Sequence, residues 1–177
     1  YVITHGSSQQ GRPTVRRGTA WCHEPERWRV DMKLLVCVDL SDSTEIIVKN
    51  IEEITRAIPA KVWLLHNAMP EPDFVEFTVD PLAAREALAK KFHAEHRQIQ
   101  ELADRMRNAG VDTTALLVHG PTVETILKEA SDLQVDMIVV GSHGRGAMYQ
   151  LLMGSISEAV LHKSPFPILV VPTHKRA

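Results

Sequence analysis

The sequence has few cysteines. Only two of its 177 residues are cysteine, Cys22 and Cys37, and they are far apart. This excludes a disulfide framework and a C-x-x-C metal motif. Cys37 lies within an apolar run, so we expect it to be a small buried side chain rather than a ligand for metal. Such cysteine usage is typical of the reducing cytoplasm, where we expect the protein to be located.

The sequence also lacks a basic excess and long apolar runs. Its formal net charge is −2 and its pI is near 6.5, whereas a surface that binds nucleic acid normally leaves a clear basic excess. No apolar run approaches the roughly 18 residues that span a bilayer, and the polar N-terminus is not a secretory signal. We therefore expect neither nucleic acid nor a membrane as a partner. The composition, 44% apolar and 24% charged, is typical of a globular domain.

The first part of the chain differs from the rest, because it is rich in glycine, serine, glutamine and arginine and shows no sustained periodicity. We expect a flexible extension there, either an upstream start or a vector-derived segment, with Met32 as a natural start. Trp21 and Trp28 are unusual in a linker and leave open a partner-binding arm. The expected division is an extension at 1–31, one domain at 32–173 and a tail at 174–177.

From Met32 onward, apolar strands alternate with amphipathic helices. Continuous apolar runs, typical of strands covered on both faces, predict strands at Lys33–Asp39, Lys61–Asn67, Thr113–Val118, Val135–Val140 and Ile168–Val171. Helices are expected to begin at Asp42, Asp80-Pro81, Gly120-Pro121 and about Gly154. The order βαβαβαβαβ predicts an α/β fold, an open Rossmann-like parallel sheet with helices on both faces.

The limits of two helices carry local signals. Asp42 is expected to cap the first helix, with Glu45 three residues on as its capping-box partner. The apolar positions of this helix, at helical spacing, are Ile47, Ile51, Ile54 and Ile58. Gly110 is expected to lie just past the end of the long second helix.

Three loops should meet at one edge of this sheet. In open α/β sheets, ligands bind outside the carboxyl ends of the strands, where the strand order reverses. The loops expected there are Asp39-Leu40-Ser41, His66-Asn67-Ala68 and Gly141–Ser157. These loops predict the location of a binding site.

The third loop has the most informative spacing. Gly141, Gly144 and Gly154 would let the backbone approach a ligand, since they carry no β-carbon. Ser155 and Ser157 follow at the start of a helix, whose free N–H groups and positive dipole end favour an anion. An ordinary glycine-rich turn with a serine cap is the alternative.

The stretch VDMIVVGSHGRGAMYQLLMGSISEAVLHKSPFPILVVP, residues 135–172, resembles the C-terminal half of a universal stress protein. Its G-x2-G-x9-G-[S/T] motif is that of the family's ATP-binding members. The opening KLLVCVDLSDSTEIIVKN resembles the family's first strand and helix, including Asp39. The resemblance covers Met32 to about Pro172. It implies a five-stranded sheet of order 3-2-1-4-5, ATP binding, a role in the stress response and a homodimer.

The resemblance also implies a role for each part of the site. Asp39 would contact the ribose or adenine side, and the backbone at Asn67 would flank the adenine. Val140–Gly144 would wrap the α- and β-phosphates and Gly154–Ser157 the terminal ones, with Mg²⁺ held by the phosphates. Asn67 stands where the family often has a small apolar residue, so a side chain pointing into the pocket would change base preference. The expected ATP-binding residues are Cys37, Val38, Asp39, Leu40, Asn67, Val140, Gly141, Ser142, His143, Gly144, Arg145, Gly146, Gly154, Ser155, Ile156 and Ser157.

Several of these residues have a structural interpretation as well. Asp39 at a strand end could cap the next turn, and Arg145 could neutralise a phosphate or lie in solvent. Lone histidines such as His66 and His143 are more often packing or hydrogen-bonding residues than catalysts. The pair His93 and His96 has no evident third ligand, which favours a solvated helix face over a metal site.

No nucleophile–base pair or carboxylate dyad accompanies the loops, and no Walker P-loop or G-x-G-x-x-G motif occurs. We therefore expect an ATP-binding regulatory module without catalytic residues. A slow ATPase and a non-nucleotide interaction protein remain alternatives. In each case an uncovered edge strand favours a homodimer through Phe166–Val171.

Overall fold

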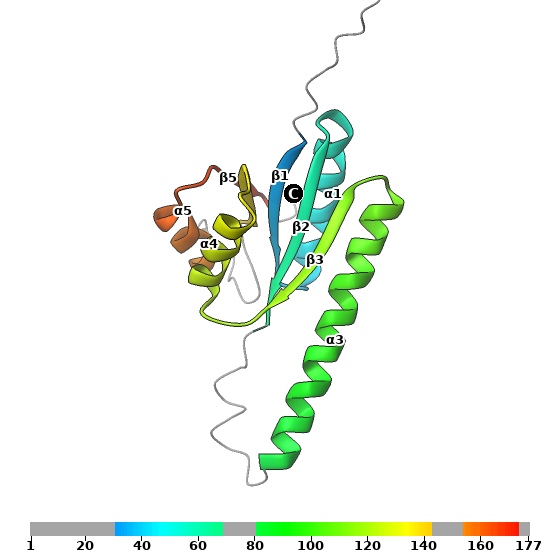
Figure 1. Ribbon diagram of the computed structural model, residues 1–177, viewed down its shortest axis with the longest axis vertical. Coiled ribbons are helices and arrows are strands. Elements are labelled where there is room, and N and C mark those ends of the chain that lie inside the picture. The colour runs from blue at the N-terminus through cyan, green and yellow to red at the C-terminus, as the bar shows by residue number, and fades with distance from the viewer. Residues whose placement is uncertain (1–30, 69–80, 143–153, 174–177) are drawn as a thin grey trace, which may run out of the picture.

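The computed structural model describes residues 31–68, 81–142 and 154–173 (Figure 1). The expected tail 174–177, and the extension 1–31 apart from Asp31, lie outside these residues. Within them the elements run in the expected alternation. They are β1 (Met32–Val38), α1 (Asp42–Ala57), β2 (Ala60–Asn67), α3 (Pro81–Asn108), β3 (Asp112–Val118), α4 (Thr122–Asp132), β4 (Met137–Gly141), α5 (Ser155–Lys163) and β5 (Ile168–Val171).

The strands form one parallel sheet in the order β3-β2-β1-β4-β5. The prediction of an α/β fold with this strand order is confirmed. β1 lies between β2 and β4, and the chain moves outward from it in opposite directions. The carboxyl ends of β1 and β4 are therefore the point at which the strand order reverses.

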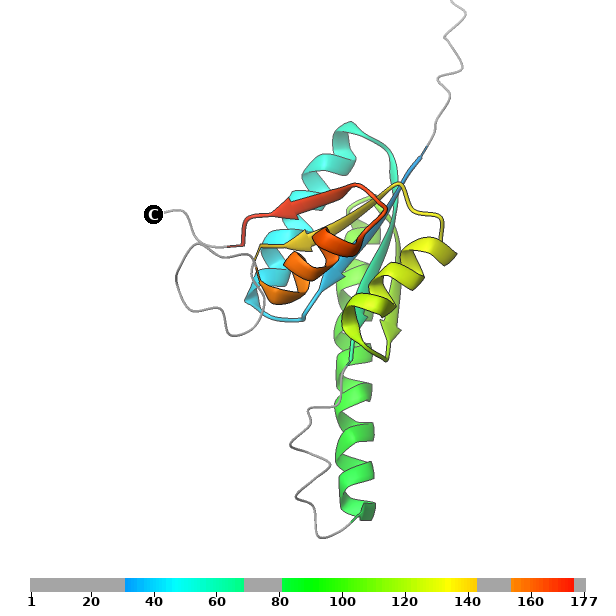
Figure 2. The same ribbon diagram turned by 90° about the vertical axis from the view of Figure 1, so that its left-hand side faces the viewer.

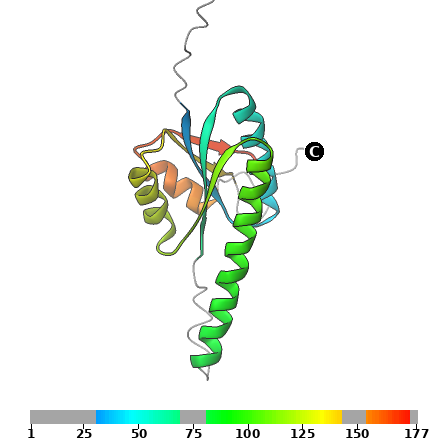
Figure 3. The same ribbon diagram turned by 45° about the vertical axis from the view of Figure 1, so that its right-hand side comes forward.

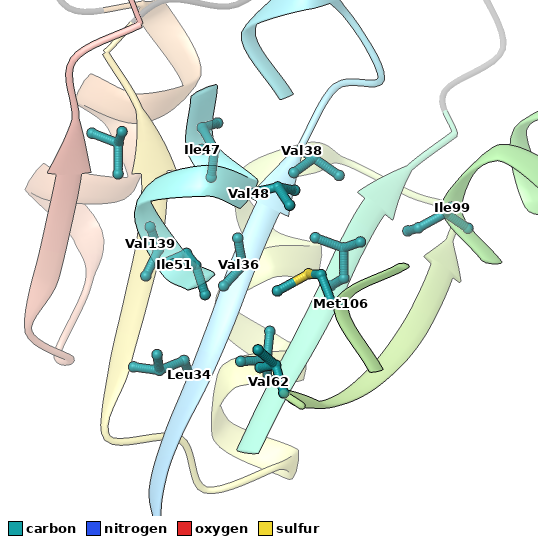
Figure 4. Packing of buried hydrophobic residues seen from close by; sticks show 13 residues of the cluster. Leu34, Val36, Val38, Ile47, Val48, Ile51, Val62, Ile99, Met106 and Val139 are labelled. Atoms are coloured by element: carbon teal, nitrogen blue, oxygen red, sulfur yellow. The ribbon is translucent and has the colours of Figure 1, made fainter. Parts of the chain in front are cut away.

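Helices cover both faces of the sheet, as Figure 2 shows with α4 and α5 in front and α1 and α3 behind. Alternate residues of a strand point to opposite faces, and the core is divided accordingly. Leu34, Val36, Val62 and Leu64 pack with α1 and α3 (Figure 4), whereas Leu35, Trp63 and Leu65 pack with α4 and α5. This alternation decides on which face a polar residue at a strand end lies.

The long helix α3 packs along β3 with its carboxyl half, while its amino-terminal half extends past the sheet (Figure 3). Ile99 and Met106 of this helix are fully buried. Gly110 follows the helix with φ of +89°, a conformation that glycine adopts without strain. The expected helix end is therefore confirmed.

Two local predictions are wrong. Ser41, not Asp42, caps α1, because the Ser41 Oγ accepts a hydrogen bond from the Ser43 N–H. The expected capping box of Asp42 and Glu45 does not form, and Glu45 instead pairs with Arg105 of α3 at 2.7 Å. Ile58 was expected on the apolar helix face, but the helix ends at Ala57 and the Ile58 side chain is 45% exposed.

The fourth strand also begins later than its apolar run. Val135 was expected to open the strand, but β4 begins at Met137. The Val135 N–H instead donates to the Ala130 carbonyl at the end of α4, and the Asp136 N–H donates to the Lys33 carbonyl. A hydrogen bond at the end of α4 and a tertiary hydrogen bond to β1 therefore set this boundary.

Candidate functional site

The turn after β1 is organised by one carboxylate. Asp39 Oδ1 accepts hydrogen bonds from the Ser41 N–H at 3.1 Å, the Ser41 hydroxyl at 2.6 Å and the Thr44 hydroxyl at 3.4 Å. Between them, Leu40 adopts φ of +57°, which is uncommon for a residue with a side chain. Asp39 therefore holds the turn in place, as the structural interpretation of this residue anticipated.

The end of β2 carries two polar side chains that point to opposite faces of the sheet. Asn67 shares the face of Trp63 and Leu65, and its Nδ2 donates to the Gly120 carbonyl and to the Thr122 hydroxyl, each at 2.9 Å. The Asn67 amide thus joins β2 to the start of α4. These two bonds use the Nδ2 group of Asn67, whereas its buried Oδ1 has no hydrogen-bond partner among the described residues.

His66 shares the opposite face with Val62 and Leu64 and is buried beneath α3. Its Nδ1 lies 2.9 Å from the Val38 carbonyl oxygen, and its Nε2 lies 3.9 Å from Oε2 of Glu95 on α3. This contact with Glu95 was not predicted. The alternation along β2 would have placed His66 on the α3 face, but the pattern of α3 did not mark Glu95 as buried.

The described ends of the glycine loop are tied together by backbone hydrogen bonds. The Gly154 N–H donates to the Ser142 carbonyl at 2.7 Å, and the Ser142 N–H donates to the Val171 carbonyl at 2.8 Å. The buried Ser157 hydroxyl donates to the Gly141 carbonyl at 2.7 Å. These bonds fix the amino terminus of α5 beside the end of β4.

The first turn of α5 offers donors to an anion. Gly154 is the residue before the helix and makes no side-chain cap, so the first N–H groups have no capping partner from it. Ser155 and Ile156 are exposed. The Ser157 hydroxyl already donates its hydrogen to the Gly141 carbonyl. The helix backbone and the Ser155 hydroxyl therefore remain as donors.

The expected site residues that the structure describes lie at one edge of the sheet. Val38 is the register partner of His66, and Val36 is the partner of Val139, which brings the ends of β1, β2 and β4 level. The turn at Asp39, the backbone of Asn67 and the start of α5 therefore converge there. His143, Gly144, Arg145 and Gly146 lie outside the described residues.

A groove of about 480 Å³ opens beside the turn after β1. It separates this turn and the first turn of α1 from the carboxyl half of α3. The Arg105–Glu45 ion pair joins α3 to α1 within its lining. The lining residues are Leu40, Ser41, Asp42, Thr44, Glu45, Gln98, Glu101, Leu102 and Arg105.

Neither a reactive thiol nor a metal cluster is evident in the described part of the chain. Burial raises the pKa of the Cys37 thiol to about 12, so this side chain stays neutral in the physiological range. Among residues 31–68, 81–142 and 154–173, no three side chains of His, Cys, Asp or Glu are grouped to hold a metal ion. No helix in these ranges is both long and apolar enough to cross a membrane.

Comparison with known proteins agrees with this architecture. Universal stress protein MJ0577 of Methanocaldococcus jannaschii is 30% identical over 152 residues, covering 78% of this chain and 93% of the relative. The solved structure of MJ0577 aligns with a TM-score of 0.70 at 28% identity, over 82% of this chain and 98% of that one.

Two more distant structures share the fold and were solved with nucleotides. A universal stress protein in complex with cAMP has a TM-score of 0.60 at 23% identity, over 81% of this chain and 98% of that chain. The universal stress protein of Archaeoglobus fulgidus in complex with dAMP has a TM-score of 0.53 at 17% identity, over 79% of this chain and 97% of that chain. The model of the universal stress protein family matches residues 32–172. The chain therefore belongs to the universal stress protein family.

Proposed function

We propose that this protein binds ATP at the carboxyl edge of its sheet, as a regulatory module of the stress response. The observation that carries the proposal is the amino terminus of α5, which hydrogen bonds through Gly154 and Ser157 hold beside the end of β4. A helix amino terminus at the point where the strand order reverses favours a phosphate group. Two proteins of the same fold, bound to cAMP and dAMP, support an adenine nucleotide.

The parts of the site suit the parts of ATP. The terminal phosphates would lie on the backbone of Gly154–Ser157 and the other phosphates on Val140–Gly144, with Mg²⁺ carried by the phosphates. The Asp39 carboxylate, which is held in the turn after β1, would face the ribose or the adenine. The Asn67 amide is bonded to the β3–α4 connection, so the backbone of Asn67 would flank the base and leave the preference for adenine unchanged.

A regulatory role is favoured over rapid hydrolysis by what surrounds the phosphate position. Glu158, in the first turn of α5, is exposed and faces His162 one turn on at 4.0 Å. His66 is buried and already contacts the Val38 carbonyl. In the described residues, neither side chain is therefore placed as a general base for water attacking a phosphate.

Calorimetric titration with Mg-ATP tests the proposal. We expect a saturable heat with a dissociation constant in the micromolar range, about −8 kcal/mol, and no phosphate release over several hours. Absence of binding would favour the non-nucleotide interaction protein. Steady phosphate release, absent from a control without protein, would favour the slow ATPase.

We also propose that two copies associate through β5. The Ile138 N–H donates to the Pro167 carbonyl and the Ser142 N–H donates to the Val171 carbonyl. Because alternate residues of a parallel strand bond to the same neighbour, the N–H and C=O groups of Ile168 and Val170 point to the outer edge of the sheet. An edge strand with free backbone groups readily pairs with a second copy.

The substitution Val170→Pro is expected to convert the protein from dimer to monomer, because proline has no N–H to donate across the edge. Val170→Thr is the matched control, since it keeps the N–H, the β-branched shape and the strand propensity. Sedimentation velocity at several concentrations measures both. A monomeric wild type, or a Val170→Pro variant as dimeric as the Val170→Thr control, would contradict pairing through β5.

A further inference from the structure

The strand β3 is the outermost strand on its side of the sheet, beside α3 (Figure 1). The Ala68 N–H donates to the Val118 carbonyl at 2.9 Å, so the backbone groups of Val118 point toward the end of β2. Because alternate residues of a parallel strand bond to the same neighbour, Thr113, Ala115 and Leu117 point their backbone groups to the outer edge. Such outward N–H and C=O groups are a template for pairing with another strand.

One of these outward groups already has a partner from α3. Arg107 Nη1 donates to the Thr113 carbonyl oxygen at 2.6 Å, which agrees with the outward direction of this carbonyl. Nη2 of the same guanidinium donates to Asp104, three residues earlier on α3. Because a donor lies roughly in line with the carbonyl that it bonds, the guanidinium is held where a further strand would have to run.

The rest of the β3 edge is bare in the described part of the chain. Within residues 31–68, 81–142 and 154–173, the outward backbone groups of Ala115 and Leu117 have no hydrogen-bond partner. The run from Ala115 to Val118 contains neither a charge nor a proline, which are usual devices against edge pairing. The contact from Arg107 is therefore the device that the described residues supply at this edge.

A second copy of β3 matches this edge by symmetry. Two antiparallel β3 strands related by a two-fold axis at Ala115 would place Thr113 opposite Leu117 of the second copy. Opposite residues of such a pair exchange both hydrogen bonds, so the Thr113 carbonyl would have to accept from the second copy. Arg107 occupies that carbonyl, and its side chain is 40% exposed. An incoming strand would therefore also remove water from a charged group, which is costly.

We propose that Arg107 closes the β3 edge against a second copy of this chain, so that self-association is confined to β5. The two edges differ, since no described residue bonds to the outward groups of Ile168 and Val170. A sheet with two open edges can add copies without end, whereas a sheet with one open edge stops at a two-fold dimer. Withdrawal of the guanidinium makes β3 a second pairing surface.

Sedimentation velocity of Arg107→Ala at several concentrations tests the proposal. We expect assemblies of at least about twice the wild-type mass, in a proportion that rises with concentration. Arg105→Ala is the matched control, because it removes the same charge from the same helix at a side chain that pairs with Glu45. Arg107→Lys should sediment as the wild type, since an ammonium group can also donate to the Thr113 carbonyl. Equal sedimentation of Arg107→Ala and Arg105→Ala would overturn the proposal.

A second substitution locates the new contact. Leu117→Pro removes an outward N–H of β3 and leaves the bonds to β2 in place, so it should restore wild-type sedimentation to Arg107→Ala. Leu117→Val keeps the N–H and should leave the larger assemblies unchanged. Larger assemblies that survive Leu117→Pro would form through a different surface, which would refute pairing through β3.

A measurement on the wild type keeps the test valid if Arg107→Ala fails to fold. In hydrogen exchange followed by NMR, the outward amides of Ala115 and Leu117 should exchange at least about 100-fold faster than the inward amides of Leu116 and Val118. This difference should be the same at every protein concentration. Protection of the outward amides that increases with concentration would mean that β3 pairs in spite of Arg107.

The growth of assemblies beyond a dimer rests on the proposed pairing through β5, and the Val170→Pro background separates the two proposals. There, Arg107→Ala should form a dimer through β3, whereas Val170→Pro alone should be monomeric. A monomeric wild type would contradict pairing through β5 but would leave this comparison in force. A monomeric double variant would contradict the role of Arg107.

Discussion

Replacing Ser155 by glutamate is expected to abolish ATP binding while leaving the domain folded. Ser155 is the first residue of α5 and is exposed, so a longer side chain meets no core. An acid in the first turn of a helix is compatible with the helix dipole, but its carboxylate would occupy and repel the phosphate position. We expect a loss of affinity of at least about 100-fold, equivalent to about 2.7 kcal/mol, in a calorimetric titration with Mg-ATP.

Two further variants at the start of α5 separate the effect of charge on ATP affinity from the effect of side-chain size. Ser155→Gln has nearly the same size as Ser155→Glu without the charge, and it should retain binding within about tenfold. Gly154→Val should block the phosphates by bulk, and the extended backbone of Gly154, with φ of −56° and ψ of 144°, accommodates a β-branched side chain. Wild-type affinity in Ser155→Glu or Gly154→Val would mean that the phosphates do not lie at the start of α5.

Replacing Gly120 by alanine is expected to destabilise the domain by about 2–4 kcal/mol. Gly120 has φ of +140°, and an added Cβ would lie 2.8 Å from the Thr125 hydroxyl oxygen. The Thr125 hydroxyl is attached directly to Cβ and can move away only by rotating χ1. The Gly120 carbonyl also accepts from Asn67, so the strain would reach the end of β2. Urea denaturation measures the change in the free energy of unfolding.

Gly110 provides a matched control for the contact with Thr125. It also has positive φ, at +89°, but an added Cβ would meet nothing within 4 Å. Gly110→Ala should therefore cost only the backbone strain, about 1–2 kcal/mol. Equal losses in the two variants would show that the steric contact at Gly120 is relieved without cost, and that backbone strain alone explains both.

The fold could be predicted because its signals are local and repeated. Apolar runs such as Val62–Leu65 are buried on both faces, as expected for a strand in a parallel sheet that is covered by helices on both sides. Gly110 marked the end of α3 for an equally local reason, its positive φ. The cap of α1 could not be read in the same way, since Ser41 and Asp42 are both good capping residues and the Asp39 carboxylate decides between them.

The sequence by itself determined the α/β fold and, through its family resemblance, the strand order, and it predicted the edge of the sheet at which the candidate site lies. Periodicity suffices for the fold class, because it acts through the backbone, whereas the strand order followed from the family resemblance. Only the tertiary structure decided what the polar side chains at this edge contact. It turned the Asn67 amide toward α4 and placed His66 against Glu95, since contacts between residues distant in the chain depend on how helices pack on the sheet.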